Sequence, residues 1–250
     1  MTRDTGNRRR SPGTEAQSRR TAGIAAASRE ERPPAKTPPL IVCVHATPRA
    51  IAPTHRLFAC AEGEFRCQDL VEERLFTCEA DGDVGRTLFL DTLRRAAADG
   101  PAVILTTCSM YTQYLSQARR EIETPLVGID EAMILRAAQR GGPFALVGSL
   151  PSAITLTRQA ICERAATIGT DATIAETRLI DADACATEAR THRLADELRE
   201  LSSRVHTVVV VQLSLSGVAE LLSAAEQSRI LTSAASALER LRAAVEESQS

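Results

Sequence analysis

From residue 40 onward, short runs of apolar and β-branched residues alternate with longer segments of helical spacing. The runs predict β-strands at residues 40–44, 65–71, 103 onward, 125–128, 144–148, 173–180, 206–212 and 229–231. The segments between them predict helices at residues 50–60, 85–99, 111–121, 130–140, 151–166, 182–203, 216–225 and 235–247. Strands joined by helices of this length are typical of parallel βαβ units, so the sequence predicts an α/β fold.

The two halves of the chain resemble each other. Residues 44–51 (VHATPRAI) match residues 147–154 (VGSLPSAI) at an offset of 103, and residues 103–110 (VILTTCSM) match residues 208–215 (VVVVQLSL) at an offset of 105. Matches in the same order at similar spacing indicate an internal repeat. We therefore expect two pseudo-symmetric lobes, residues 40–143 and 144–250, each a mainly parallel sheet flanked by helices, with a cleft between them. The closing helix of the second lobe is free to pack back on the first.

Residues 1–39 differ in composition from the rest. They are rich in Arg, Ser, Thr, Pro and Gly and contain nine basic and four acidic residues. Such a segment buries too little apolar surface to offset the entropy lost on ordering. We predict a disordered basic tail.

Composition excludes several classes of function. The chain has 30 basic and 32 acidic residues and no Trp, which gives no case for a nucleic-acid partner. No apolar run approaches the roughly 18 residues that span a bilayer, so a membrane partner is not expected either. Lys36 is the single lysine and lies in the tail. Schiff-base enzymes, pyridoxal-phosphate enzymes and P-loop NTPases are therefore disfavoured, and no cofactor is expected.

Seven cysteines are spread through the chain without a CxxC pair. Zinc knuckles need such closely spaced pairs, so the spacing predicts no metal site. An odd number of cysteines without a signal peptide suits a reducing compartment. We expect free thiols and a cytoplasmic protein.

Cys108 stands where the run that starts at Val103 stops. The carboxyl ends of strands in parallel α/β sheets are where ligands bind, because loops and helix N-termini converge there. A thiol has a pKa of about 8.5 in water, lowered by nearby N–H groups, so it can exchange protons near neutral pH. Cys108 is therefore a candidate acid/base, although a free cysteine is as often a small buried apolar residue.

These residues resemble the aspartate/glutamate/hydantoin racemase superfamily over roughly residues 40–235. The resemblance rests on four strand ends: Val44-His45-Ala46-Thr47-Pro48, Thr107-Cys108-Ser109, Val147-Gly148-Ser149 and Val211-Gln212-Leu213-Ser214. It implies a cofactor-independent isomerase built from two α/β lobes, in which one thiolate removes the proton next to a carboxylate and an opposite thiol returns it. In this resemblance Cys108 is the first-lobe cysteine.

The same resemblance implies that hydroxyl groups at strand ends hold the carboxylate of a small substrate, an amino acid or a hydantoin. The candidates are Thr47, Ser109, Ser149, Ser214, Thr232 and Ser233, with His45 as a further contact. Helix capping and turn formation are the simpler roles for each of these hydroxyls. Whether the chain forms a homo-oligomer stays open.

The sequence departs from the two-cysteine pattern. In the repeat alignment Cys108 meets Leu213, and Ser109 meets Ser214. A leucine cannot exchange protons, so three alternatives to a two-thiol racemase stay open. They are a one-cysteine decarboxylase or lyase, a member that binds a small carboxylate without turnover, and a cysteine hydrolase with His45 as its base.

Overall fold

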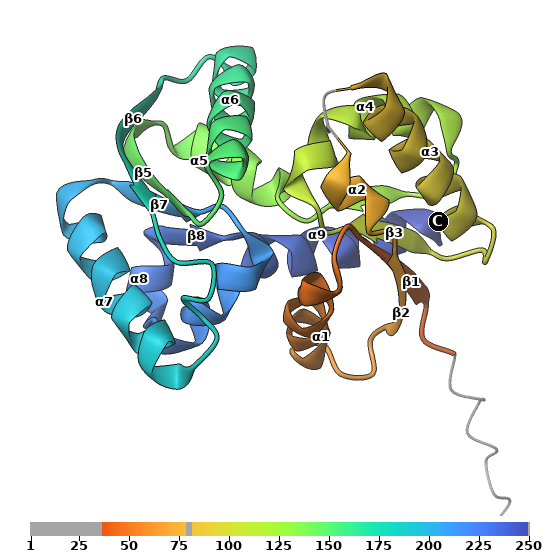
Figure 1. Ribbon diagram of the computed structural model, residues 1–250, viewed down its shortest axis with the longest axis horizontal. Coiled ribbons are helices and arrows are strands. Elements are labelled where there is room, and N and C mark those ends of the chain that lie inside the picture. Colours follow the sequence, from red (N-terminus) through yellow and green to blue (C-terminus); the bar gives the residue numbers. More distant parts are fainter. Residues whose placement is uncertain (1–36, 79–81, 250) are drawn as a thin grey trace, which may run out of the picture. The chain divides into compact units, whose positions relative to one another are not determined.

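The computed structural model describes residues 37–78 and 82–249, and in them two four-stranded parallel sheets (Figure 1). The first sheet has the order β2 (Arg66–Val71), β1 (Leu40–His45), β3 (Val103–Thr106), β4 (Leu126–Gly128). The second has the order β6 (Ala172–Leu179), β5 (Gly142–Gly148), β7 (Thr207–Val210), β8 (Ile230–Thr232). The two orders are the same pattern, which confirms the predicted α/β fold with two pseudo-symmetric lobes.

Helices connect and flank the strands. The α-helices are α1 (Ile51–Ala59), α2 (Arg74–Thr77), α3 (Asp83–Ala97), α4 (Leu115–Glu121), α5 (Glu131–Arg140), α6 (Pro151–Ile168), α7 (Glu188–Arg204), α8 (Ala224–Gln227) and α9 (Ser233–Ser248). Three 3₁₀ helices are η1 (Pro48–Ala50), η2 (Ser109–Tyr114) and η3 (Leu213–Leu221). None of the helices in the described ranges combines the length and apolarity that a membrane span requires.

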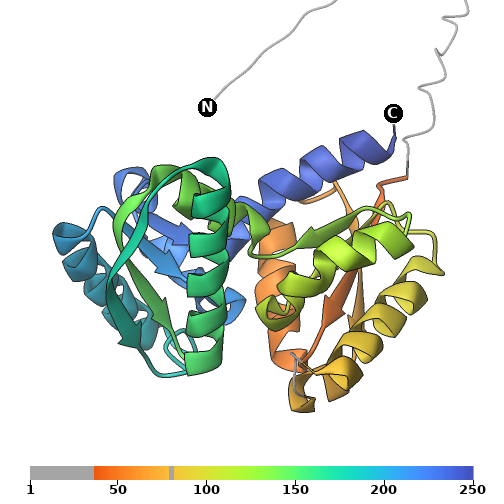
Figure 2. The same ribbon diagram turned by 90° about the horizontal axis from the view of Figure 1, so that it is seen from above.

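Two helices pack on the sheet of the other lobe. Ala237 and Leu241 of α9 lie in one buried cluster with Ile41 of β1 and Val103 of β3. Figure 2 shows α9, in blue, running to the first lobe. In the opposite sense, α5 follows the first sheet but buries its apolar face, including Met133, against the second. This exchange joins the two sheets through shared cores.

The helices that follow β3 and β7 differ from the prediction in the same way. Each was expected as an α-helix but opens as a 3₁₀ helix, η2 and η3. Helix α7 also begins later than predicted, at Glu188, after a series of turns. Thr187 sets this start because its side chain accepts a hydrogen bond from the Arg190 N–H as the N-cap. The predicted tail falls, for residues 1–36, outside the described residues.

Candidate active site

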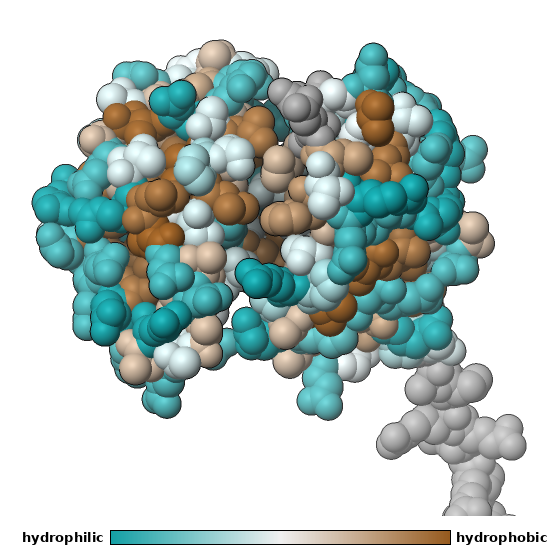
Figure 3. Space-filling view, viewed as in Figure 1, coloured by the Kyte–Doolittle hydropathy of each residue, from teal (hydrophilic) through white to brown (hydrophobic). Residues whose placement is uncertain are grey.

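Cys108 follows the end of β3 and is half-buried at the N-cap of η2. It faces a cavity of about 770 Å³ that residues of both lobes line. The molecule is hollowed between its two lobes on the face shown in Figure 3. A cavity of this size holds a small ligand with room to spare.

The free thiol of Cys108 is held in its protonated form. Burial raises its pKa to about 11, and the charge of Asp130 adds to the rise. The backbone N–H groups of Met110 and Tyr111 oppose the rise without cancelling it. Cys108 is thus an acid at neutral pH, and it becomes a base only after it has given its proton away.

Backbone hydrogen bonds fix which residue of the second lobe corresponds to Cys108. The amide of Thr107 donates to the carbonyl of Val44 at 3.0 Å. The amide of Val211 donates to the carbonyl of Val147, also at 3.0 Å. Because β1 and β5 are equivalent strands, Thr107 and Val211 occupy equivalent places.

The next residue along the chain is therefore Cys108 in the first lobe and Gln212 in the second. Each is the N-cap of the 3₁₀ helix that follows it. The sequence alignment, which put Leu213 opposite Cys108, was wrong by one position. The physical cause of this error is the run of four valines at 208–211. Identical residues do not define the register of a strand, whereas the hydrogen bonds of the sheet do.

Gln212 has a defined orientation at the second-lobe strand end. Its side-chain oxygen accepts hydrogen bonds from the backbone N–H of Ser149 and, at 3.0 Å, from the Ser149 hydroxyl. Its NH₂ group has no partner among the described residues and is left to donate. Leu213, the next residue, also borders the cavity, but its side chain is buried in a cluster with Leu57 of α1 and with α9. The second strand end thus carries a hydrogen-bond donor in place of an acid.

The hydroxyl candidates divide into two groups. The four that line the cavity with Cys108 are Thr47, Ser109, Ser149 and Ser214. Thr232 and Ser233 do not line it, because α9 begins directly after β8 and buries both. The Ser233 hydroxyl lies 3.3 Å from that of Ser216.

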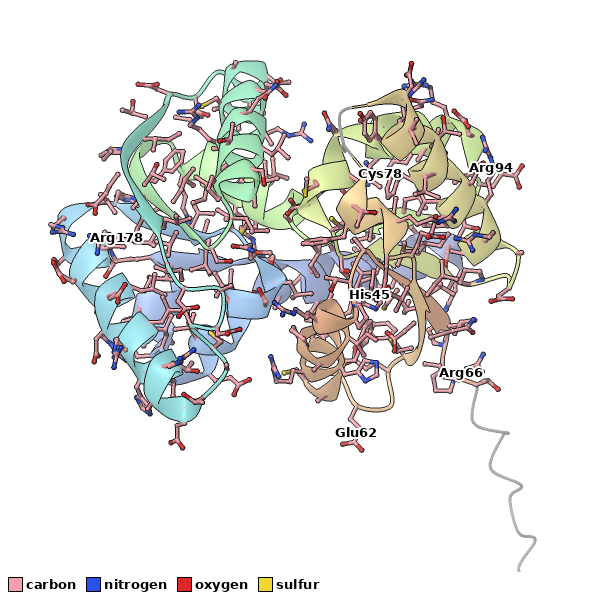
Figure 4. The ribbon with its side chains drawn as sticks, in the orientation of Figure 1. His45, Glu62, Arg66, Cys78, Arg94 and Arg178 are labelled. Carbon is pink, nitrogen blue, oxygen red and sulfur yellow. The ribbon has the colours of Figure 1, made fainter. Side chains whose placement is uncertain are left out.

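His45 also lies outside the cavity lining. It is the last residue of β1, and Figure 4 shows it within the first lobe. Its ring is fully buried, with Nδ1 2.9 Å from the Thr107 hydroxyl and Nε2 2.9 Å from the carboxylate of Asp69. Burial lowers its pKa in spite of the Asp69 carboxylate. His45 is therefore placed to fix its neighbours and not to act as a base for Cys108.

Sequence reasoning missed two arginines at the cavity. Arg49 and Arg56 line it and are exposed, and neither guanidinium forms an ion pair or hydrogen bond with the described residues. Free guanidinium groups match a carboxylate in charge and shape. The sequence offered one signal for Arg49, its position two residues after Thr47, which the structure places in η1 directly after β1.

The second lobe contributes one thiol to the cavity, at a place that the repeat did not indicate. Cys185 lies in the turns before α7 and lines the cavity. Its Sγ donates to the carbonyl of Leu215 at 3.4 Å, and burial raises its pKa. The exposed carboxylate of Asp183 lines the same cavity.

Asp130 directly precedes α5, the usual position of an N-cap, but its side chain makes no capping hydrogen bond. Its carboxyl group is buried and accepts a hydrogen bond of 2.7 Å from the Thr112 hydroxyl. It borders a second cavity, of about 390 Å³, which shares Ser109 and Met110 with the first. Burial raises the pKa of Asp130 to about 7.

This raised pKa predicts a pH-dependent stability. A carboxyl group that is harder to ionise in the folded chain stabilises the fold at low pH, and the stabilisation disappears as pH rises through about 7. Between pH 5 and pH 8 the loss is about 3 kcal/mol at the upper limit. We expect Asp130→Asn to remove this pH dependence. The unfolding free energy of the variant should therefore increase relative to that of the wild type as the pH rises.

Urea unfolding at pH 5 and pH 8 measures this difference. Asp171→Asn, at an exposed position, is the control, and an equal trend in both variants would contradict the assignment.

Comparison with known proteins agrees with this architecture. The model of the Asp/Glu/Hydantoin racemase family matches residues 15–241. The chain belongs to the Asp/Glu/hydantoin racemase family. No curated protein matches it in a search by sequence.

Solved structures of this fold act on different compounds. Allantoin racemase from Klebsiella pneumoniae is similar at 15% identity and a TM-score of 0.60, over 83% of this chain and 88% of that one. A glycine-to-cysteine mutant of arylmalonate decarboxylase is similar at 17% and 0.56, over 83% and 94%. A cysteine-to-serine mutant of maleate cis-trans isomerase from Nocardia farcinica, with a covalently bound succinylcysteine intermediate, is similar at 13% and 0.55, over 83% and 93%. At these identities the likeness shows the fold, and the racemase-family reaction has to be argued from the site.

Proposed function

We propose that this racemase-family chain transfers a proton at a carbon next to a carboxylate, with Cys108 as the acid, from one face of the substrate. The observation that carries the proposal is a thiol at a strand end in a cavity lined by both lobes, with Gln212 at the equivalent strand end where two-sided transfer needs a second thiol. Burial raises the pKa of this thiol to about 11, which suits an acid. An amide cannot give or take a proton near neutral pH.

The cavity supplies the groups that would hold the carboxylate. Arg49 and Arg56 offer guanidinium groups without partners among the described residues, and the NH₂ group of Gln212 is also free to donate. The hydroxyls of Thr47 and Ser149 line the same space. Binding through these groups would place the neighbouring carbon against the sulfur of Cys108.

A thiol whose pKa is raised to about 11 suits a reaction whose intermediate must be protonated. We favour a lyase acting on a malonate-type substrate, the substrate class named for one of the structural neighbours. In that reaction the bond between the substrate carbon and one carboxylate breaks, and carbon dioxide leaves. The electron pair of that bond stays on the substrate and forms an enolate. The S–H proton of Cys108 then goes to the carbon, and solvent returns a proton to the thiolate.

A second candidate is a two-base racemase of amino acids or hydantoins that uses Cys185 as the second thiol. One observation favours it: Cys185 comes from the second lobe and lines the same cavity as Cys108. Two factors count against this role. Cys185 is not at a strand end, and its S–H group already donates to the Leu215 carbonyl.

The experiment is a turnover screen in heavy water. The purified chain is incubated with arylmalonates, maleate, allantoin, aspartate and glutamate, and deuterium on the carbon next to the carboxylate is measured by NMR. We expect deuterium in the product of a malonate-type substrate. If no compound of these classes is changed or exchanged, the proposal is wrong.

A further inference from the structure

We propose that Cys43, Cys67 and Asp69 form a binding site for a divalent metal ion such as zinc, separate from the cavity at Cys108. The three side chains come from adjacent strands: Cys43 from β1, Cys67 and Asp69 from β2. Asp69 is paired with Cys43 in the strand register, and Cys67 lies two residues before it on the same face. None of the three lines either cavity.

Two of the three distances between the ligand atoms are close to those of a tetrahedral ion. The Cys43 and Cys67 sulfurs are 3.3 Å apart, and the Cys67 sulfur is 3.9 Å from Oδ1 of Asp69. All three atoms lie within 4.8 Å of one another. Zinc bonds of about 2.3 Å to sulfur and about 2.0 Å to oxygen put two sulfurs about 3.8 Å apart and sulfur about 3.5 Å from oxygen. Shifts of about half an ångström therefore bring the first two distances to the values that zinc requires.

Two histidines hold the carboxylate in this position. His45 Nε2 is 2.9 Å from Oδ1 of Asp69, and His55 Nε2 is 2.7 Å from Oδ2. A carboxylate that binds a metal is commonly fixed by such outer hydrogen bonds, which raise the affinity of the site. The fully buried His45 ring is locked in turn by the Thr107 hydroxyl, so the orientation of Asp69 is set from inside the protein.

The surroundings indicate the fourth ligand and the metal class. Cys43 is buried, Cys67 is half-buried, and the Asp69 side chain is 22% exposed, so one side of the cluster is open to solvent. Both histidines are already paired with Asp69, which leaves a water molecule as the fourth ligand. Two thiolates with one carboxylate favour zinc over magnesium or calcium, which prefer oxygen ligands alone.

Binding exchanges protons for the metal. Cysteine sulfurs bind such an ion as thiolates, so metal binding releases protons to the buffer. The affinity is therefore expected to increase with pH, and no oxidant is needed.

The test is a titration of the full chain with Co²⁺ under reducing conditions, after treatment with a chelator. We expect one ion per chain, a thiolate-to-cobalt charge-transfer band, release of protons to the buffer, and displacement of cobalt by Zn²⁺. Cys67→Ser and Asp69→Asn should each weaken binding at least about 10-fold, while buried Cys43 is left unchanged to preserve the core. Cys60→Ser, an exposed cysteine outside the cluster, should bind as the wild type does.

Three results would overturn the site. One is a wild-type chain that binds no cobalt although circular dichroism shows it folded. Another is an unchanged cobalt band in Cys67→Ser, or an equal loss in Cys60→Ser. The third is conversion of the Cys43 and Cys67 thiols to a disulfide with no metal binding when they are reduced again.

Discussion

Replacing Cys108 with alanine is expected to lower proton transfer to the substrate carbon by about 10²- to 10⁴-fold, the usual contribution of a positioned acid or base. Alanine lacks the sulfur atom, so it has no proton to give. Substrate affinity should change little, because the proposed carboxylate contacts come from Arg49, Arg56 and Gln212. The measurement is the rate of deuterium incorporation in heavy water at saturating substrate.

The matched control is Cys162→Ala. Cys162 is an exposed free cysteine of α6, outside the cavity lining, so its loss should leave the rate unchanged. Cys108→Ser adds a second comparison, since a hydroxyl is a much weaker acid than a thiol. Incorporation at the wild-type rate in Cys108→Ala would assign the proton to another group.

Replacing Gln212 with cysteine is expected to convert one-sided proton transfer into two-sided transfer. The hydrogen-bond register makes Gln212 the counterpart of Cys108, so a thiol there stands at the second strand end of the same cavity. The wild type should form one enantiomer of a chiral product, and the variant should form a product that approaches equal amounts of both. Chiral chromatography of the product measures the ratio.

The Leu213→Cys variant tests whether the thiol must stand at the position equivalent to Cys108, or whether a neighbouring position is sufficient. Leu213 is the neighbour that the sequence alignment placed opposite Cys108, and it also borders the cavity, but its side chain is buried in the cluster with α1 and α9. A thiol at that position should leave the product as a single enantiomer. A mixture from Leu213→Cys together with a single enantiomer from Gln212→Cys would restore the sequence alignment and refute the structural one.

The sequence predicted the fold because its signal is local and repeated. Apolar runs and helical spacing mark nearly every strand and helix, and the match of residues 44–51 with 147–154 indicated a second lobe before any contact was known. Four of the hydroxyl candidates line the cavity for the same reason, since the ends of parallel strands share one edge.

What the sequence could not predict depends on register and on burial. Four consecutive valines look the same when shifted by one residue, so Gln212 was passed over for Leu213. Asp130 follows a strand and precedes a helix, the usual place of a cap, and only its burial shows another role. The cysteines at 43 and 67 are 24 residues apart and show no metal-binding spacing, yet strand pairing brings their sulfurs together.

The most direct test of one-sided proton transfer is the stereochemistry of the wild-type product formed in heavy water. The proposal predicts a single enantiomer that carries one deuterium at the carbon next to the carboxylate, and no exchange when that product is incubated again. A racemic product that exchanges on further incubation would contradict it. If that exchange were then lost in Cys185→Ser, Cys108 and Cys185 would be the two bases of a racemase.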